Sequence, residues 1–283
     1  MEIKNISVVG GGTMGNGIAH VFAMKNFMVN LVEMSEELAD KAVAIISKNL
    51  ARQIKKEIIS EKDKKDILSR INKVVGIDNT PQNSGLVIEA IYENKEAKLN
   101  VFNKLNHLIE PNSLFASNTS SISITELSQT GRADKFIGMH FMNPVPVMKL
   151  VEIIRGYSTS DETYNTIKEL VLKLDKTPVE VFDYPGFISN RVLMPMINEA
   201  IFALMEGVAS AEDIDTVMKL GMNHPMGPLT LADFIGLDVC LAIMDVLYTG
   251  YNDSKYRPCP LLKKMVAAKK LGRKTGEGFF IYK

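Results

Sequence analysis

A short apolar segment that runs into a glycine cluster near the start of the chain constrains the fold most. Residues 3–9 are rich in Ile and Val and end at Gly10-Gly11-Gly12-Thr13-Met14-Gly15. We expect a buried parallel strand, a tight turn and then a helix over residues 13–25. A second apolar run over residues 28–32 ends at Glu33. These segments together predict a βαβ unit.

The glycine spacing in this turn suits a bound dinucleotide. Gly10 can make the turn, Gly12 lets the backbone approach a pyrophosphate, and Gly15 allows close packing of helix against strand. The first helical residues, Thr13 and Met14, lie where a helix N-terminus offers N–H groups and partial positive charge to phosphates. The motif therefore predicts a dinucleotide site.

Glu33 narrows the choice of dinucleotide. It lies 18 residues after Gly15, at the end of the second predicted strand. A carboxylate there can accept hydrogen bonds from both ribose hydroxyls and would repel a 2'-phosphate. We therefore expect NAD rather than NADP, while FAD remains an alternative on the glycine motif alone.

Strand-like and helical segments alternate as far as residue 182. The expected strands cover residues 74–77, 86–90, 114–117, 136–140, 150–154 and 179–182. The expected helices cover 95–109, 161–174 and most of 36–72, with a break near Ser60. This alternation predicts an α/β fold whose first domain, residues 1–184, is a Rossmann-type, mostly parallel sheet.

The pattern changes after the turn signal Asp183-Tyr184-Pro185-Gly186. Helical segments separated by Gly and Pro breaks follow, with one last strand expected over residues 279–282. We therefore predict a smaller, all-helical second domain over residues 185–283. Its apolar segments at 192–204 and 229–247 could form a subunit interface.

Composition excludes several classes of protein. Lys plus Arg and Asp plus Glu are equal at 33 each, which argues against binding nucleic acid or an anionic membrane surface. The only cysteines, Cys240 and Cys259, form no zinc-binding pattern and no disulfide framework, so we expect no metal. No apolar run reaches membrane-spanning length, and the early strand leaves no room for a signal peptide. We expect a cytoplasmic protein.

His140 and Glu152 are candidates for the reacting centre. Oxidation of an alcohol needs a base for the hydroxyl proton, and histidine can take and return a proton near neutral pH. His140 ends one predicted strand, and Glu152 lies in the next. A turn around residues 143–146 could bring the carboxylate to the ring and fix its tautomer. From spacing alone, a structural histidine and a surface carboxylate explain the pair equally well.

Four segments, in order, resemble motifs of L-3-hydroxyacyl-CoA dehydrogenases. They are SNTSS at 117–121, HFMNPVPVMKLVE at 140–152, DYPGFISNR at 183–191 and KTGEGF at 274–279. The resemblance covers essentially the whole chain, and the short form is similar to the bacterial 3-hydroxybutyryl-CoA dehydrogenases. It implies reversible NAD-dependent oxidation of (S)-3-hydroxybutyryl-CoA to acetoacetyl-CoA, by a homodimer formed through the helical domain.

The resemblance also assigns roles to individual residues. It makes His140 the acid/base, Glu152 its orienting carboxylate, and Ser120 and Asn190 the groups that position the substrate oxygen. It places a further set near the nicotinamide half of NAD: Glu93, Lys98, Ser120, Asn143 and Lys274. Ser120 and Asn190 could instead be helix caps.

A basic stripe is a candidate for the phosphates of coenzyme A. Lys48, Arg52, Lys55 and Lys56 recur at helical spacing on one predicted helix. A solvated helix face explains the same charges. The resemblance favours CoA, because Asn49 and Lys56 fall where the family contacts it, and Arg52 lies on the same stripe.

Two other functions fit part of the sequence. Relatives with a similar His/Glu pair act on hydroxy acids or sugar acids such as gulonate, and they would not need the basic stripe. A non-catalytic NAD-binding protein could keep the fold, as some lens proteins do. The complete set of His140, Glu152, Ser120 and Asn190 argues against that reading.

Overall fold

The computed structural model describes residues 3–282, which divide between Asp183 and Tyr184 into two compact units. We call them the sheet unit and the helical unit. The sheet unit contains one eight-stranded sheet in the order β3-β2-β1-β4-β5-β6-β7-β8. Its strands are β1 Asn5–Val9, β2 Met28–Glu33, β3 Ile71–Val75, β4 Leu86–Glu89, β5 Leu114–Ser117, β6 Phe136–Phe141, β7 Leu150–Arg155 and β8 Thr177–Phe182. All neighbouring strands pair in parallel except β6 and β7.

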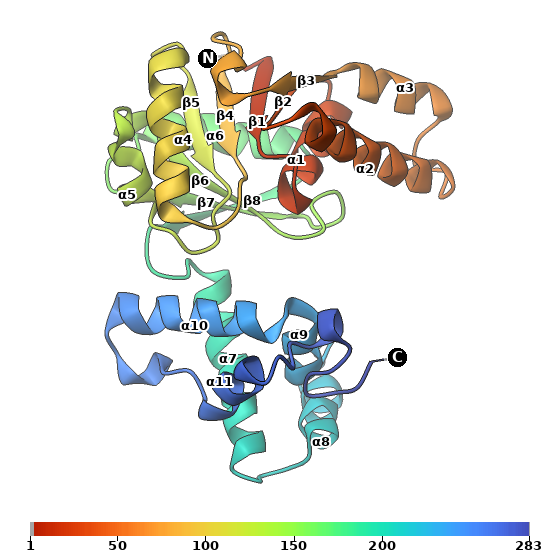
Figure 1. The fold of residues 1–283 in the computed structure, drawn as a ribbon, viewed down its shortest axis with the longest axis vertical. Coiled ribbons are helices and arrows are strands. Elements are labelled where there is room, and N and C mark those ends of the chain that lie inside the picture. The colour runs from red at the N-terminus through yellow and green to blue at the C-terminus, as the bar shows by residue number, and fades with distance from the viewer. Residues whose placement is uncertain (1–2, 283) are drawn as a thin grey trace. The chain divides into compact units, whose positions relative to one another are not determined.

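Helices pack on both faces of this sheet, as Figure 1 shows. They are α1 Thr13–Met24, α2 Glu36–Ile54, α3 Glu61–Ser69, α4 Lys95–Leu108, α5 Ile124–Leu127 and α6 Asp161–Lys173. Apolar side chains of α1, α2 and α6 share one core cluster with alternate residues of the strands. The aromatic ring of Phe102 on α4 contacts Phe115 and Phe136, which belong to the opposite set of alternate residues. The sheet therefore has an α1/α6 face and an α4 face.

Local signals explain most helix starts. Ser60 caps α3 and forms a reciprocal capping box with Asp63, so a second helix begins where the break in the helical stretch was expected. The strand predicted at 74–77 is shifted, because β3 begins three residues earlier, at Ile71, and ends at Val75. The chain then turns at Gly76, whose φ is 83°. Only a residue tolerant of positive φ fits that turn.

The helical unit contains α7 Ser189–Met205, α8 Ala211–Thr216, α9 Pro228–Ile235, α10 Leu237–Tyr251 and α11 Pro260–Ala267. Its own apolar core includes Ile201 of α7, Leu229 of α9 and Leu247 of α10. The Rossmann-type, mostly parallel sheet followed by a helical domain is confirmed. No helix within residues 3–282 is both long enough and apolar enough to cross a bilayer.

The predicted last strand at 279–282 is wrong. This segment forms an isolated bridge between Ile281 and Glu277 instead of a strand. The buried carboxylate of Asp233 on α9 instead accepts the N–H groups of Phe279 and Phe280, each at 3.0 Å. A side chain therefore occupies the backbone donors that a neighbouring strand would otherwise have used.

Candidate active site

The glycine loop between β1 and α1 has the geometry that a pyrophosphate requires. A Cβ on Gly10, whose φ is 94°, would lie 2.9 Å from the Ala90 carbonyl oxygen, and a Cβ on Gly15 would lie 1.7 Å from that of Gly10. Nothing lies within 4 Å of a Cβ on Gly12. Gly12 is also the N-cap of α1 and gives its first turn no side-chain hydrogen bond. The backbone around Thr13 and Met14 is thus open to an anion.

Glu33 lies at the end of β2, beside this loop. Its Oε1 accepts the Gly11 N–H at 2.5 Å, and its Oε2 accepts the Met34 N–H at 3.1 Å. These bonds hold the carboxylate where a ribose would follow the pyrophosphate. Its place fits NAD.

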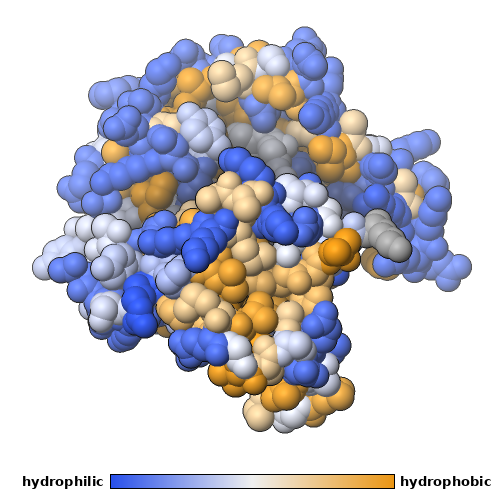
Figure 2. Space-filling model, turned by 60° about the horizontal axis from the view of Figure 1, so that its bottom comes forward, coloured by the Kyte–Doolittle hydropathy of each residue, from blue (hydrophilic) through white to orange (hydrophobic). Residues whose placement is uncertain are grey.

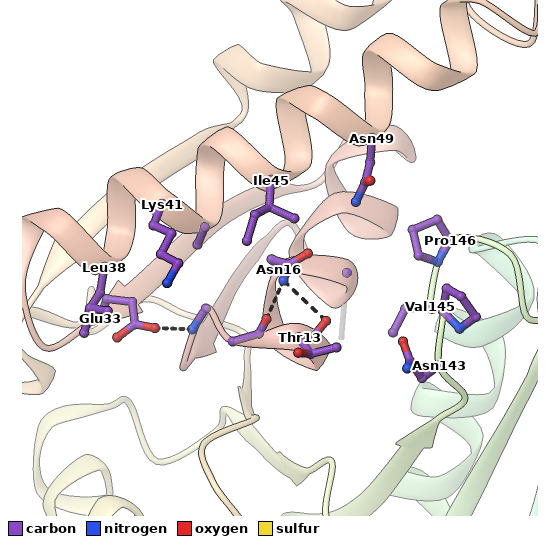
Figure 3. Close-up of a pocket in the computed structure, with 15 residues that line it drawn as sticks. Thr13, Asn16, Glu33, Leu38, Lys41, Ile45, Asn49, Asn143, Val145 and Pro146 are labelled. Carbon is purple, nitrogen blue, oxygen red and sulfur yellow. Dashed lines mark hydrogen bonds between the residues drawn. The ribbon is translucent and has the colours of Figure 1, made fainter. Parts of the chain in front are cut away.

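Two pockets flank the loop, and Glu33 lines both. One, of about 620 Å³, lies at the carboxyl ends of β1 and β4, where the strand order reverses, and extends along α4 to Val101 and Lys104. Ligands of doubly wound folds bind at such a switch point. The second, of about 400 Å³, lies between α2 and residues 143–146. Figure 3 shows Lys41, Ile45 and Asn49 of α2 on one side of it and Asn143 on the other.

His140 and Glu152 meet across the antiparallel pair of β6 and β7. They are register partners, and His140 Nδ1 lies 2.7 Å from Glu152 Oε2. Both side chains are buried. Because an ionised carboxylate only accepts, Nδ1 carries the proton in this contact, which puts the basic lone pair of the neutral ring on Nε2. The contact expected from the intervening turn is present.

A second cluster of charges lies at the ends of β4 and β5. The Lys98 ammonium is 2.6 Å from Glu89 Oε1 and 3.3 Å from Glu93 Oε2. Burial raises the pKa of Glu89, although Lys98 and Ser117 oppose that rise. Burial also acts to raise the pKa of Glu93, but Lys98 and the donors of residues 119–121 outweigh it and lower that pKa. Glu93 and Lys98 therefore act as one paired group.

Ser120 lies in the turn that follows β5. Its N–H donates to Glu93 Oε1 at 3.0 Å. The cap of the next helix, α5, is Ser123, whose hydroxyl accepts the Glu126 N–H at 3.2 Å. The alternative that Ser120 caps this helix is therefore wrong, and its position is set by Glu93.

The polar residues near the ends of four neighbouring strands share one face of the sheet. Ile88, Ala116, Met139 and their counterparts in β7 belong to the core on the α1/α6 face. The alternate residues must face α4: Glu89, Ser117, His140 and Glu152. The His140–Glu152 pair and the Glu89–Lys98 pair thus lie on the same side of one sheet.

Sequence reasoning missed Glu89, Thr119 and Lys176. The buried Lys176 ammonium donates to the carbonyls of Val145 and Met148, each at 2.6 Å, and so anchors the loop that carries Asn143. Burial lowers the pKa of Lys176, and Lys149 adds to the effect. The signal in the sequence that could have identified Lys176 was a charged residue at the border of an apolar run.

Two proposed site residues belong to the helical unit. Asn190 is buried in the first turn of α7, whose N-cap is Ile188, so Asn190 is not the cap. Lys274 forms an ion pair with Asp238 on its exposed surface. That pair and the Asp238–Val239 backbone counter the effect of burial and lower the pKa of Asp238.

The basic stripe is shorter than predicted. Helix α2 ends at Ile54, so Lys55 is its C-cap and Lys56 lies in the following turn rather than on the helix. Asn49 lines the smaller pocket, and its Oδ1 accepts from Arg52 at 3.3 Å. Asn49 and Arg52 therefore lie together, with Lys56 just beyond the helix.

The remaining histidines lie on other elements than His140. His20 is buried within α1, and both of its ring nitrogens are without a hydrogen-bond partner. His107 is in the last turn of α4, and His224 lies in the loop before α9. Within residues 3–282, no three His, Cys, Asp or Glu side chains come together as a metal site.

The sequence and the structure both match known proteins over the whole chain. The family model for the 3-hydroxyacyl-CoA dehydrogenase NAD-binding domain matches residues 5–184, and the model for the C-terminal domain of that family matches residues 186–282. The 3-hydroxybutyryl-CoA dehydrogenase of Bradyrhizobium diazoefficiens is 52% identical over 282 residues, which cover 99% of this chain and 96% of that protein.

More distant relatives and a solved structure agree. Human mitochondrial hydroxyacyl-coenzyme A dehydrogenase is 42% identical over 288 residues, covering 99% of this chain and 92% of its own. The crystal structure of (S)-3-hydroxybutyryl-CoA dehydrogenase from Ralstonia eutropha superimposes with a TM-score of 0.97 at 50% identity and covers 100% of both chains. The chain belongs to the 3-hydroxyacyl-CoA dehydrogenase family and carries its NAD-binding domain.

Proposed function

We propose that this protein catalyses the reversible oxidation of (S)-3-hydroxybutyryl-CoA to acetoacetyl-CoA, with NAD as cofactor. The observation that carries the proposal is the 2.7 Å contact between His140 Nδ1 and Glu152 Oε2, in a sheet unit with an open glycine loop. Relatives about half identical over the full chain, named as 3-hydroxybutyryl-CoA dehydrogenases, support the substrate.

The chain offers two groups of residues for the cofactor. Gly10, Gly12 and Gly15 shape the loop at the pyrophosphate, Thr13 and Met14 present backbone N–H groups, and Glu33 accepts from the ribose. The nicotinamide half takes Glu93, Lys98, Ser120, Asn143 and Lys274. When bound, NAD⁺ supplies the hydride acceptor.

His140 moves the proton. In oxidation, Nε2 takes the proton of the 3-hydroxyl group while the hydrogen on C3 leaves with its electron pair. In reduction, the imidazolium returns that proton to the forming alkoxide. Glu152 holds the Nδ1 proton and stabilises the imidazolium, while Ser120 and Asn190 donate hydrogen bonds to the substrate oxygen.

Asn49, Arg52 and Lys56 are the proposed contacts for coenzyme A. Asn49 lines the 400 Å³ pocket. Arg52 lies in the last turn of α2 and Lys56 just beyond it, and their positive charges would attract phosphates. The test compares NADH oxidation by acetoacetyl-CoA in wild type and in the double variant Arg52→Glu with Lys56→Glu. The double reversal Lys62→Glu with Lys65→Glu on α3 is the matched control.

We expect wild-type turnover and a KM for acetoacetyl-CoA raised about tenfold or more by the α2 reversal only. No turnover by micromolar wild-type enzyme would contradict the catalytic assignment. An unchanged KM in the α2 variant would sink the CoA assignment. Faster NADH formation from gulonate and NAD⁺ than from (S)-3-hydroxybutyryl-CoA would favour the hydroxy-acid alternative.

We also propose that the protein forms a homodimer through its helical unit and works in the cytoplasm. Figure 2 shows apolar groups gathered over this unit. The exposed apolar side chains of the unit include Val192, Leu220 and Phe234. Both cysteines are free and buried, which suits a reducing compartment. Sedimentation should give twice the chain mass, and a monomer at micromolar concentration would contradict the dimer.

A further inference from the structure

Glu89, at the end of β4, is an acidic side chain with no access to solvent. Its Oε1 accepts from the Lys98 ammonium at 2.6 Å and from the Ile91 N–H at 2.7 Å. Its Oε2 accepts from the Ser117 hydroxyl at 2.6 Å. Both carboxylate oxygens are therefore committed, and each points to a different element, α4 or β5.

These contacts belong to a closed ring of hydrogen bonds and ion pairs. The Thr119 N–H donates to Ser117 Oγ at 3.2 Å, and the Thr119 hydroxyl donates to Glu93 Oε1 at 2.5 Å. Glu93 Oε2 lies 3.3 Å from the Lys98 ammonium. The same ammonium donates to Glu89, which closes the ring. All five members lie in the sheet unit.

The ring sets the position of Ser120. The Ser120 N–H and the Ser121 hydroxyl both donate to Glu93 Oε1, at 3.0 Å each. Glu93 is partly exposed, so its position depends on its partners in the ring. One of these partners is Lys98, whose side chain is only 1% exposed. A buried ammonium requires an anion beside it, and Glu89 is the fully buried one.

Stability alone does not account for this arrangement. A buried ion pair replaced by apolar groups of similar size often costs nothing, because the desolvation of both charges offsets their attraction. Residue types with no charge would therefore fill the space between β4 and α4 as well. What the charges add is a fixed direction for each donor and acceptor around Ser120.

We propose that Glu89 is a positioning residue for hydride transfer, holding Lys98 so that Glu93 fixes Ser120 toward the substrate oxygen. This inference rests on the proposed function, because it gives Ser120 and the Glu93–Lys98 pair the roles stated there. Glu89 touches neither substrate nor cofactor. Glu89 links Lys98 and Glu93, on the nicotinamide side, to Ser120, which orients the substrate oxygen.

Two single variants separate the two arms of Glu89. Glu89→Gln removes the charge beside Lys98, and we expect the Kd for NADH to rise about tenfold and kcat with acetoacetyl-CoA to fall by at least as much. Ser117→Ala removes only the contacts that join Glu89, through the Ser117 hydroxyl, to the turn that carries Ser120. It should lower kcat about tenfold and leave the Kd for NADH within about twofold of wild type.

A double variant tests whether Glu89 acts through Lys98. If it does, Glu89→Gln combined with Lys98→Met should bind NADH no more weakly than Lys98→Met alone, to within about twofold. Additive losses would overturn the link. Intrinsic fluorescence of NADH on binding gives the Kd without requiring turnover.

Asp215→Asn is the matched control, because Asp215 is a buried carboxylate of the helical unit that accepts from Leu229 and Thr230. It should lower Tm and leave KM and kcat unchanged. If Glu89→Gln behaves in the same way, Glu89 is only structural and the proposal fails. Failure of the proposed function shows separately, as absent wild-type turnover, and the NADH titrations then still decide whether Glu89 acts through Lys98.

Discussion

The sheet unit and the helical unit use their buried carboxylates in different ways. In the sheet unit, Glu89 pairs with Lys98 and Glu152 pairs with His140, side chain to side chain. In the helical unit, Asp215 and Asp233 accept mainly backbone N–H groups of neighbouring segments. One arrangement aims reactive groups, while the other ties chain segments together.

The difference predicts which property each substitution should change. A carboxylate that satisfies backbone donors leaves them unpaired when it is removed, and the loss appears in stability. A carboxylate that aims another side chain leaves the backbone intact, and the loss appears in activity. Substitutions in the two units can test this division.

Removal of Asp233 should destabilise the helical unit strongly. Asp233→Ala leaves the Phe279 and Phe280 N–H groups and the Tyr282 hydroxyl without their common acceptor. We expect a loss of about 4 kcal/mol in urea unfolding. Tyr282→Phe, which removes one hydroxyl donor, should cost about 1 kcal/mol. Equal losses in the two variants would show that Asp233 does not organise the C-terminal segment.

Acid should weaken the sheet unit through His20. Burial lowers the pKa of His20 to about 4 from its ordinary 6.5. The unfolded chain therefore binds the proton first, so the contribution of His20 to stability is constant above pH 6.5 and falls by about 3 kcal/mol as the pH drops toward 4. His20→Leu should remove this part of the pH dependence. Identical slopes in wild type and variant, from urea unfolding across that range, would rule His20 out.

Lys176 should show a smaller and mixed effect, because it is a side chain that holds backbone carbonyls beside the site. Lys176→Met frees the carbonyls of Val145 and Met148 but also removes a buried charge. We expect about 1 kcal/mol of lost stability and a kcat lowered about tenfold. A large loss of stability with normal kcat would show that Lys176 has only a structural role, like Asp215 and Asp233 in the helical unit.

Local features of the site could be predicted from the sequence. The glycine loop, Glu33 and the β1–α1–β2 order depend on residues close together in the chain. His140 and Glu152 could also be paired, because a short connection between neighbouring strands brings them opposite each other. The break near Ser60 was predicted from the length of the helical stretch, and its physical cause is a capping box between Ser60 and Asp63.

Features that depend on strand order could not be predicted in this way. Glu89, Lys98 and Ser117 meet only because β4 lies beside β5 and α4 packs on that face, and no local spacing shows this. Lys176 resembles any surface lysine until residues 145–148 are placed over it. The final segment, 279–282, has strand-like residues but meets a carboxylate instead of a strand.

The steady-state rate of NADH oxidation by His140→Asn tests the central claim most directly. The variant keeps a polar side chain but cannot transfer the proton, so kcat with acetoacetyl-CoA should fall about a thousandfold. The Kd for NADH should stay within about twofold of wild type, since the glycine loop and Glu33 are untouched. Wild-type kcat in this variant would contradict the assignment of His140 as the acid/base.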